Sequence, residues 1–252
     1  MKKIALITGA TAGIGQAIAK KLASLDFNLI LTGRRNERLE TLKKELISKY
    51  SIEVLTFNFD VRNKNEVSQH INSLNKNWKD IDLLVNNAGL AAGLGTIQEG
   101  EIDDWERMID TNIKGLLYMT RAISPLMIER KKGQIINIGS IAGKEVYPNG
   151  AVYCSTKHAV DALNKGMRID MVQHGIKVSA IHPGMVDTEF STVRFHGDKA
   201  KADTVYEGLT PLYAEDIADA VEFAVTRPAH VNINDMVIMP TAQAAATVVV
   251  RD

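Results

Sequence analysis

The sequence of 252 residues contains a single cysteine, Cys154, and no excess of charge of either sign. One cysteine excludes an intrachain disulfide, which favours a reducing compartment. Lysine and arginine together number 30, as do aspartate and glutamate. This balance gives no reason to expect nucleic acid or an anionic membrane as a partner.

Long apolar runs are also missing. The first residues, MKKIALITGA, hold too few consecutive apolar side chains for a signal peptide. No stretch approaches the roughly 20 apolar residues that are needed to cross a bilayer. Linkers, repeats and low-complexity tracts are absent from the sequence, and no metal site is predicted. We therefore expect a cytoplasmic protein with one domain over residues 1–252.

What the sequence contains is an alternation of short apolar runs with longer amphipathic stretches. Strands are predicted at 3–8, 28–33, 54–59, 81–89, 133–140, 176–184 and 235–240. Helices are predicted at Ile14–Leu25, Asn36–Ser48, Lys64–Leu74, Asp103–Arg130, Tyr153–Val172 and Ala214–Thr226. The runs are nearly continuously apolar, as in a parallel sheet covered on both faces. The pattern predicts an α/β fold with a doubly wound parallel sheet.

Two segments fall outside this alternation. Residues 185–211 are the least regular part of the chain, and long irregular segments are usually functional. We predict that they form a lid over a substrate. The C-terminal AAATVVVRD is short and apolar, and we interpret it as a packing tail at an oligomer contact.

A glycine-rich turn, TGATAGIG, joins the first predicted strand to the first predicted helix. Gly9, Gly13 and Gly15 would allow a tight turn and let the backbone approach a pyrophosphate at the helix N-terminus. Their spacing differs from the common dinucleotide pattern, and a structural turn alone would also explain the glycines. Their position between a strand and a helix favours the dinucleotide interpretation.

The second strand lacks the acidic residue that binds the ribose 2′-hydroxyl in enzymes that use NAD. It is followed instead by Gly33, Arg34 and Arg35. Guanidinium groups suit a phosphate, so this position favours NADP. A solvated basic helix start is the alternative, although cations there oppose the helix dipole.

Polar residues also follow the third and fourth strands. Asp60, next to Val61, is placed to accept from an adenine amino group or to cap the next helix. The NNAG motif at 86–89 is suited to bridging neighbouring strand ends and lining a nucleotide cleft. A structural turn is the alternative for this motif.

Tyr153 and Lys157 stand four residues apart in a predicted helix, so they share one face. A nearby ammonium would lower the pKa of a phenol toward the working range of a proton donor. Ser140, at the end of the fifth strand, would hydrogen-bond a substrate oxygen. Asn112 would hold a water that links Lys157 to solvent. Taken singly, Tyr153 also suits a core, Lys157 a solvated face and Ser140 a helix cap.

Together, TGATAGIG, NNAG, Ser140 and YCSTK resemble the short-chain dehydrogenase/reductase family, almost from end to end. The resemblance implies a Rossmann-type sheet, a nicotinamide cofactor and a catalytic tetrad of Asn112, Ser140, Tyr153 and Lys157. It further implies that HPGMVDT at 182–188 faces the nicotinamide, with His182 packed rather than catalytic. The implied cofactor-binding residues are Gly9, Thr11, Gly13, Ile14, Gly15, Arg34, Arg35, Asp60, Val61, Asn87, Ala88, Gly89, Tyr153, Lys157, Pro183, Gly184, Val186 and Thr188.

Further segments, among them GRRNERLE, VDTEFSTVRF and RPAHVNIN, resemble the NADP-dependent 3-hydroxy acid dehydrogenases that act on serine and allo-threonine. A carboxylate substrate needs a cation, and Arg194 is our candidate to bind it beside Ser140 and Tyr153. Lys144 is the second choice, and a surface arginine on a mobile loop is the alternative for Arg194.

Two other functions stay open at this point. One is an NADPH-dependent carbonyl, keto-ester or pterin reductase, and the other is a nucleotide-binding regulator without turnover. Relatives use the helices that carry Asn112 and Tyr153 as subunit contacts, so the resemblance implies a homotetramer or homodimer.

Overall fold

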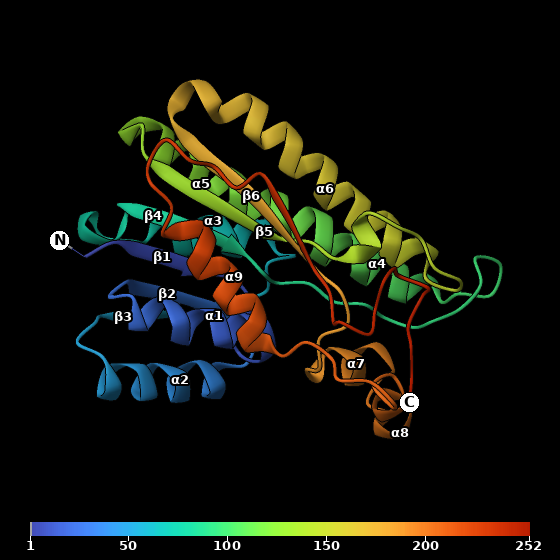
Figure 1. The fold of residues 1–252 in the computed structure, drawn as a ribbon. Helices are drawn as coiled ribbons and strands as arrows, with labels where there is room; N and C mark the ends of the chain where they lie inside the picture. Colours follow the sequence, from blue (N-terminus) through green and yellow to red (C-terminus); the bar gives the residue numbers. More distant parts are fainter. Residues whose placement is uncertain (1) are drawn as a thin grey trace.

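Seven parallel strands form the centre of the computed structural model, which describes residues 2–252 (Figure 1). The strands are β1 (Ile4–Ile7), β2 (Asn28–Gly33), β3 (Val54–Asn58), β4 (Ile81–Asn86), β5 (Gly133–Ile138), β6 (Ile176–Pro183) and β7 (Asp235–Ile238). Their order in the sheet is β3-β2-β1-β4-β5-β6-β7. All seven predicted strands and the predicted α/β class are confirmed.

Helices cover both faces of the sheet because each strand buries side chains on both sides. Along β1, Ala5 and Ile7 face one core, and Ile4 and Leu6 face the other. The first core is closed by α1 (Gly13–Ser24), α2 (Asn36–Lys49) and α9 (Ala214–Val225). The second core is closed by α3 (Lys64–Asn72), α5 (Leu116–Arg130) and α6 (Ala151–Met171).

The prediction of one continuous helix over Asp103–Arg130 is wrong. The chain forms α4 (Ile102–Ile109), a π-helical turn at Asp110–Gly115, and then α5. Turns of this kind widen a helix by one residue and occur often at functional sites. Asn112 lies within the turn, and its side chain bonds the backbone of Leu90 next to β4. The interruption therefore places a polar side chain where a regular helix would not hold it.

The segment 185–211, the predicted lid, is more regular than its sequence indicates. It contains two short helices, α7 (Glu189–Arg194) and α8 (Lys199–Thr204). Its two ends meet in a parallel bridge between Val186 and Leu212. The last residue of the chain also lies on this segment, because the Asp252 amide donates to the Gly208 carbonyl at 2.9 Å. The tail thus has a contact within its own chain.

Short helical turns complete the chain at η1 (Lys76–Trp78), η3 (Ile141–Gly143) and η4 (Val172–His174). Over residues 2–252, no helix has both the length and the apolar character that a membrane crossing requires.

Candidate active site

A cleft of about 320 Å³ opens at the carboxyl ends of the strands, where the strand order reverses between β1 and β4. This is the place where open α/β sheets bind nucleotides. The cleft is lined by every residue predicted to bind the cofactor: Gly9, Thr11, Gly13, Ile14, Gly15, Arg34, Arg35, Asp60, Val61, Asn87, Ala88, Gly89, Tyr153, Lys157, Pro183, Gly184, Val186 and Thr188. The structure therefore gathers residues that are far apart in the sequence into one groove.

The glycine turn forms one wall of this cleft. Gly9 and Gly13 adopt positive φ angles of 67° and 51°, which side-chain-bearing residues rarely adopt. A Cβ atom on Gly15 would lie 2.4 Å from the Gly9 carbonyl oxygen, so the turn is tight as well as left-handed. Such a bare backbone at the N-terminus of α1 suits a pyrophosphate.

The predicted bridging role of the NNAG motif is confirmed. Asn87 Nδ2 donates to the carbonyl oxygens of Thr8 and Gly9, at 2.8 and 3.2 Å. Asn86 Nδ2 donates to Thr120 Oγ1 and to Asn137 Oδ1, at 3.0 and 2.9 Å. These bonds tie the ends of β1, β4 and β5 together and fix the floor of the cleft.

The two arginines after β2 differ in their surroundings. Arg35 donates from Nε and Nη2 to Thr11 Oγ1, at 3.1 and 2.9 Å, so it is joined to the glycine turn. Arg34 is more exposed, and its nearest carboxylate, on Asp60, lies 3.9 Å away. Both arginines line the cleft, and their guanidinium groups are suited to a phosphate.

Asp60 does not cap the next helix, because Asn63 accepts from the first amides of α3 instead. The Asp60 carboxylate bonds the backbone amide and the guanidinium of Arg62. Burial works against these bonds, yet their combined effect holds the pKa of Asp60 below its usual range. Asp60 therefore lines the cleft as a carboxylate.

Tyr153 and Lys157 lie in the first two turns of α6, and both are buried. Lys157 Nζ donates to the Ile138 carbonyl oxygen at 3.0 Å and lies 6.0 Å from the centre of the Tyr153 ring. Ser140 lies opposite, in the turn after β5, and its hydroxyl accepts from the Ala142 amide at 3.1 Å. Ser140 is thus a cap of η3 and also part of the cleft.

Burial controls the acidity of this pair. It raises the pKa of Tyr153 well above 10, and the hydroxyl of Ser140 and the charge of Arg194 only partly oppose it. Burial also lowers the pKa of Lys157 to about 8. The predicted lowering of the phenol pKa is therefore not found, because burial outweighs the nearby charges. At neutral pH the phenol holds its proton.

Asn112 lies behind the cleft rather than in its wall. Its Oδ1 accepts from the Leu90 amide at 2.9 Å, and its Nδ2 donates to the Leu90 carbonyl and Thr156 Oγ1 at 2.8 and 3.0 Å. Both polar atoms of the side chain are thus already bonded. The amide oxygen can accept a second bond, so the predicted water for Lys157 stays a prediction. Asn112 also fixes the segment after β4 that carries Gly89 and Leu90.

Arg194, at the end of α7, lies next to Tyr153. Its guanidinium carbon lies 5.7 Å from the centre of the Tyr153 ring and 5.4 Å from that of Tyr147. Its Nη2 donates to the Tyr147 hydroxyl at 3.0 Å, and its Nε donates to the Gly93 carbonyl at 3.3 Å. A second cavity of about 150 Å³ is lined by both Arg194 and Tyr153.

Sequence reasoning missed two aromatic residues here. Tyr147 is held by Arg194, and Phe190 packs edge-on against Tyr153 with ring centres 5.8 Å apart. Tyr147 stands in an irregular turn, EVYPNG, where an aromatic residue before proline is the only available signal. Phe190 lies within the irregular segment 185–211, where no periodicity indicates which side chains face inward.

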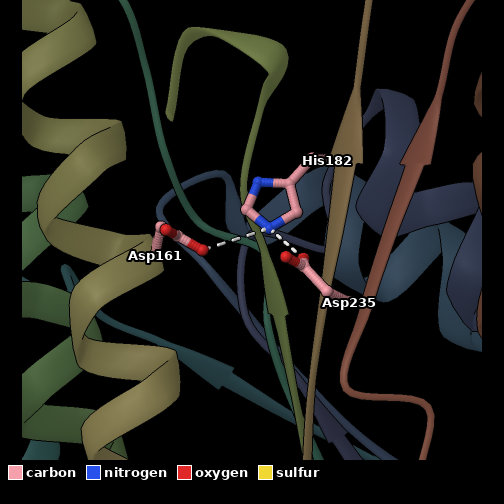
Figure 2. Close-up of side chains that lie close together, drawn as sticks. All are labelled: Asp161, His182 and Asp235. Atoms are coloured by element: carbon pink, nitrogen blue, oxygen red, sulfur yellow. Dashed lines mark ion pairs between the residues drawn. The ribbon is translucent and has the colours of Figure 1, made fainter. Parts of the chain in front are cut away.

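Lys144 is not available to a substrate carboxylate. Its Nζ donates to Asp161 Oδ1 at 2.7 Å and also to Asp235 Oδ2. These two carboxylates come from α6 and β7 and lie on either side of the His182 imidazole, as Figure 2 shows. The grouping resembles a set of metal ligands, but the Lys144 ammonium already supplies the cation between the carboxylates.

His182 is packed, as the resemblance implies. It is fully buried, its Nδ1 lies 3.2 Å from the Ser140 carbonyl oxygen, and its Nε2 lies 2.6 Å from Asp235 Oδ1. Burial lowers its pKa more than the nearby carboxylates raise it. Since its ring faces the backbone of Ser140 and not the cleft, it positions the end of β5.

Similarity to known proteins agrees with this geometry. The chain is 50% identical over 244 residues to an NADP-dependent 3-hydroxy acid dehydrogenase of Salmonella typhi, covering 96% of this chain and 97% of that protein. It is 44% identical to sulfoacetaldehyde reductase 2 of Chromohalobacter salexigens over an alignment that covers 100% of both chains. The closed form of a serine dehydrogenase complexed with NADP+ superposes with a TM-score of 0.93, at 45% identity and 99% coverage of both chains.

A family model described as short chain dehydrogenase matches residues 3–199, which include the glycine turn and the Tyr153–Lys157 pair. This match covers well over half of the 252 residues. The chain belongs to the short-chain dehydrogenase family.

Proposed function

We propose that this protein is an NADP-dependent dehydrogenase that transfers a hydride between NADP(H) and the hydroxyl-bearing carbon of a 3-hydroxy acid such as L-serine or L-allo-threonine. The dehydrogenase of Salmonella typhi and the serine dehydrogenase, at 50% and 45% identity, support this activity and this cofactor. The proposal depends on one observation: Tyr153 lines the cofactor cleft and also lies next to Arg194.

The residues of the cleft fit a dinucleotide phosphate. The left-handed Gly9 and Gly13 leave bare backbone where a pyrophosphate would lie. Arg34 and Arg35 supply the cations that a 2′-phosphate needs, and no acidic residue follows β2 to favour NAD. Pro183, Gly184 and Thr188 would hold the nicotinamide end near Tyr153.

Each residue around Tyr153 then has a distinct part in the reaction. NADP supplies a nicotinamide ring that accepts or donates the hydride. Tyr153 exchanges a proton with the substrate oxygen, and Ser140 hydrogen-bonds that same oxygen. Lys157, held by the Ile138 carbonyl, keeps a positive charge next to the phenol as it gives up its proton. Asn112 positions Gly89 and Leu90, so its contribution is indirect.

Arg194 would bind the substrate carboxylate. It lies close enough to the Tyr153 ring for one small molecule to contact both groups. The Tyr147 hydroxyl, which accepts from Arg194, would orient the guanidinium toward the substrate. A guanidinium can bind both oxygens of a carboxylate, and so fixes the distance between acid group and reacting carbon.

A second candidate reaction is the reduction of an aldehyde that carries a sulfonate group. The similarity to sulfoacetaldehyde reductase 2 favours it, and Arg194 suits a sulfonate as well as a carboxylate. The experiment is to measure NADPH formation with NADP+ and L-serine, L-allo-threonine or 3-hydroxyisobutyrate, and NADPH consumption with sulfoacetaldehyde and neutral ketones. The highest kcat/KM on a 3-hydroxy acid supports the proposal. The highest value on sulfoacetaldehyde supports the second candidate, and the highest on a neutral ketone argues against both.

A cytoplasmic homotetramer or homodimer remains part of this proposal. Leu117 on α5, the helix after the Asn112 turn, and Ile169 on α6 expose apolar side chains. Mass measurement in solution distinguishes these states.

A further inference from the structure

An ion-paired glutamate joins the predicted lid to the arginines after β2. Glu189, the first residue of α7, has one carboxylate oxygen 2.8 Å from Arg35 Nη1 and the other 2.6 Å from Arg38 Nη1. These hydrogen bonds hold the pKa of Glu189 below its usual range, so it is charged at neutral pH. The carboxylate thus lies between two guanidinium groups in the way that a bound phosphate would.

Arg35 has no guanidinium nitrogen without an acceptor. Its Nε and Nη2 donate to Thr11 and its Nη1 donates to Glu189. Arg35 is also one of the cations that our proposed function assigns to the 2′-phosphate of NADP. Three of the five N–H groups of Arg35 are thus in use, and a phosphate that takes the Nη1 position must displace Glu189.

The relative charges decide which anion Arg35 binds. The guanidinium stays protonated throughout, a carboxylate carries one negative charge, and a phosphate monoester carries close to two at neutral pH. The Glu189 pairs are nearly half exposed, so each is weak and easily replaced. NAD, which lacks this phosphate, would leave the Glu189 pairs in place.

Glu189 makes the first of three contacts, among others, that join the lid segment 185–211 to neighbouring elements. The second contact is the pair of bonds between Arg194 and the Gly93 backbone, and the third joins His196 Nε2 to Asp104 Oδ2 at 3.0 Å. Release of Glu189 would remove the contact at the start of α7 and leave the other two. Local opening becomes easier when such a contact is lost.

We propose that Glu189 competes with the 2′-phosphate of NADP for Arg35, and that the phosphate releases the start of the lid when it binds. This inference rests on the proposed use of NADP. It makes Glu189 a residue that sets cofactor specificity and connects the cofactor's phosphate to a segment that also carries Arg194.

The test is a binding measurement on Glu189→Gln by protein fluorescence or calorimetry. We expect the Kd for NADP+ and for 2′,5′-ADP to fall by roughly three- to tenfold, because two exposed ion pairs no longer compete. The Kd for NAD+ and for ADP should stay within about twofold. Glu189→Asp, which keeps the charge but shortens the reach, should give an intermediate value.

Glu37→Gln is the matched control. Glu37 lies between Arg35 and Arg38 in the sequence, in the first turn of α2. Within residues 2–252 it bonds neither of these arginines. The substitution Glu37→Gln removes the same charge as Glu189→Gln, but it should change the Kd for NADP+ much less. An equal effect of both substitutions would show that general charge, and not competition, is responsible.

Limited trypsin digestion of the wild-type protein tests the connection to the lid without any turnover. Lys199 and Lys201 in α8 are exposed cleavage sites. We expect 2′,5′-ADP to speed cleavage there and ADP to leave it unchanged. An unchanged or higher Kd for NADP+ in Glu189→Gln would overturn the inference. Failure of the wild type to bind NADP+ or 2′,5′-ADP would instead overturn the proposed function.

Discussion

The guanidinium carbon of Arg194 lies 5.7 Å from the centre of the Tyr153 ring, although one residue belongs to α7 and the other to α6. A substrate with an anionic group a short distance from its reacting oxygen would fit both groups at once. In the proposed function, this relationship connects the residue that transfers the proton with the residue that selects the substrate.

Arg194→Met should raise KM for a 3-hydroxy acid by roughly 10- to 100-fold, the cost of one hydrogen-bonded charge pair. KM for a neutral alcohol should hardly change, since such a substrate has no anion to bind. Steady-state kinetics on both substrates check this, with Arg227→Met as the control because that guanidinium packs on Phe223 outside the cleft. Equal effects on both substrates would remove Arg194 from substrate binding.

The pH dependence should differ between the two directions of the reaction. Because burial raises the pKa of Tyr153 above 10, the phenol is a ready proton donor at neutral pH. Reduction should therefore keep its rate from pH 6 to 10, because the phenol stays protonated, whereas oxidation, which needs the phenolate, should keep rising across this range. Initial rates from pH 6 to 10 in both directions test this, and an oxidation rate that levels off below pH 7 would contradict it.

The two arginines after β2 should contribute unequally to the binding of NADP. Arg35→Met should raise the Kd for NADP+ by roughly 10- to 100-fold, because Arg35 is held at the glycine turn by Thr11. Arg34→Met should have a smaller effect, because that side chain is more exposed and loosely held. Calorimetry with NADP+ and NAD+ distinguishes a lost contact with the 2′-phosphate, which only NADP+ has, from damage to the glycine turn. A matching loss of NAD+ affinity would indicate damage.

Lys144→Met should lower the free energy of unfolding by roughly 2 kcal/mol, because it leaves Asp161 and Asp235 facing each other beside His182. Lys144 and Lys165 hold the pKa of Asp161 below its ordinary 3.8. The pairing therefore stabilises the fold above about pH 4 and is lost as the pH falls through the lowered pKa. The difference from wild type should be largest near neutral pH and shrink in acid.

Urea unfolding at several pH values measures this difference. Lys165→Met is the control, since Lys165 is more exposed and should contribute less than about 1 kcal/mol. A difference that grows on acidification would show that the carboxylates are not what Lys144 stabilises.

The fold was predictable from the sequence because parallel strands leave a strong local signal. Each strand is buried on both faces, so runs such as NLILTG stand out without knowledge of any contact. The cofactor residues follow from the same signal, since they lie directly after the strands and the carboxyl ends of parallel strands meet at one edge.

The substrate side was predictable only in part, because its contacts join segments without periodicity. The bond between Arg194 and Tyr147 depends on how α7 lies across the turn before α6, which no local pattern specifies. The interruption at Asn112 depends on a bond to Leu90 in another segment, and the pairing of Lys144 depends on β7. The high pKa of Tyr153 arises from burial, which the spacing of two residues cannot indicate.

Tyr153 is the residue to which we assign proton transfer to and from the substrate oxygen. Tyr153→Phe keeps the ring and its contact with Phe190 but removes the hydroxyl. The measurement is kcat with NADP+ and the best 3-hydroxy acid, together with the Kd for NADP+ from protein fluorescence. We predict a fall in kcat of roughly 10²- to 10⁴-fold, with the Kd changed by less than about threefold. Turnover at the wild-type rate would show that the Tyr153 hydroxyl does not transfer the proton.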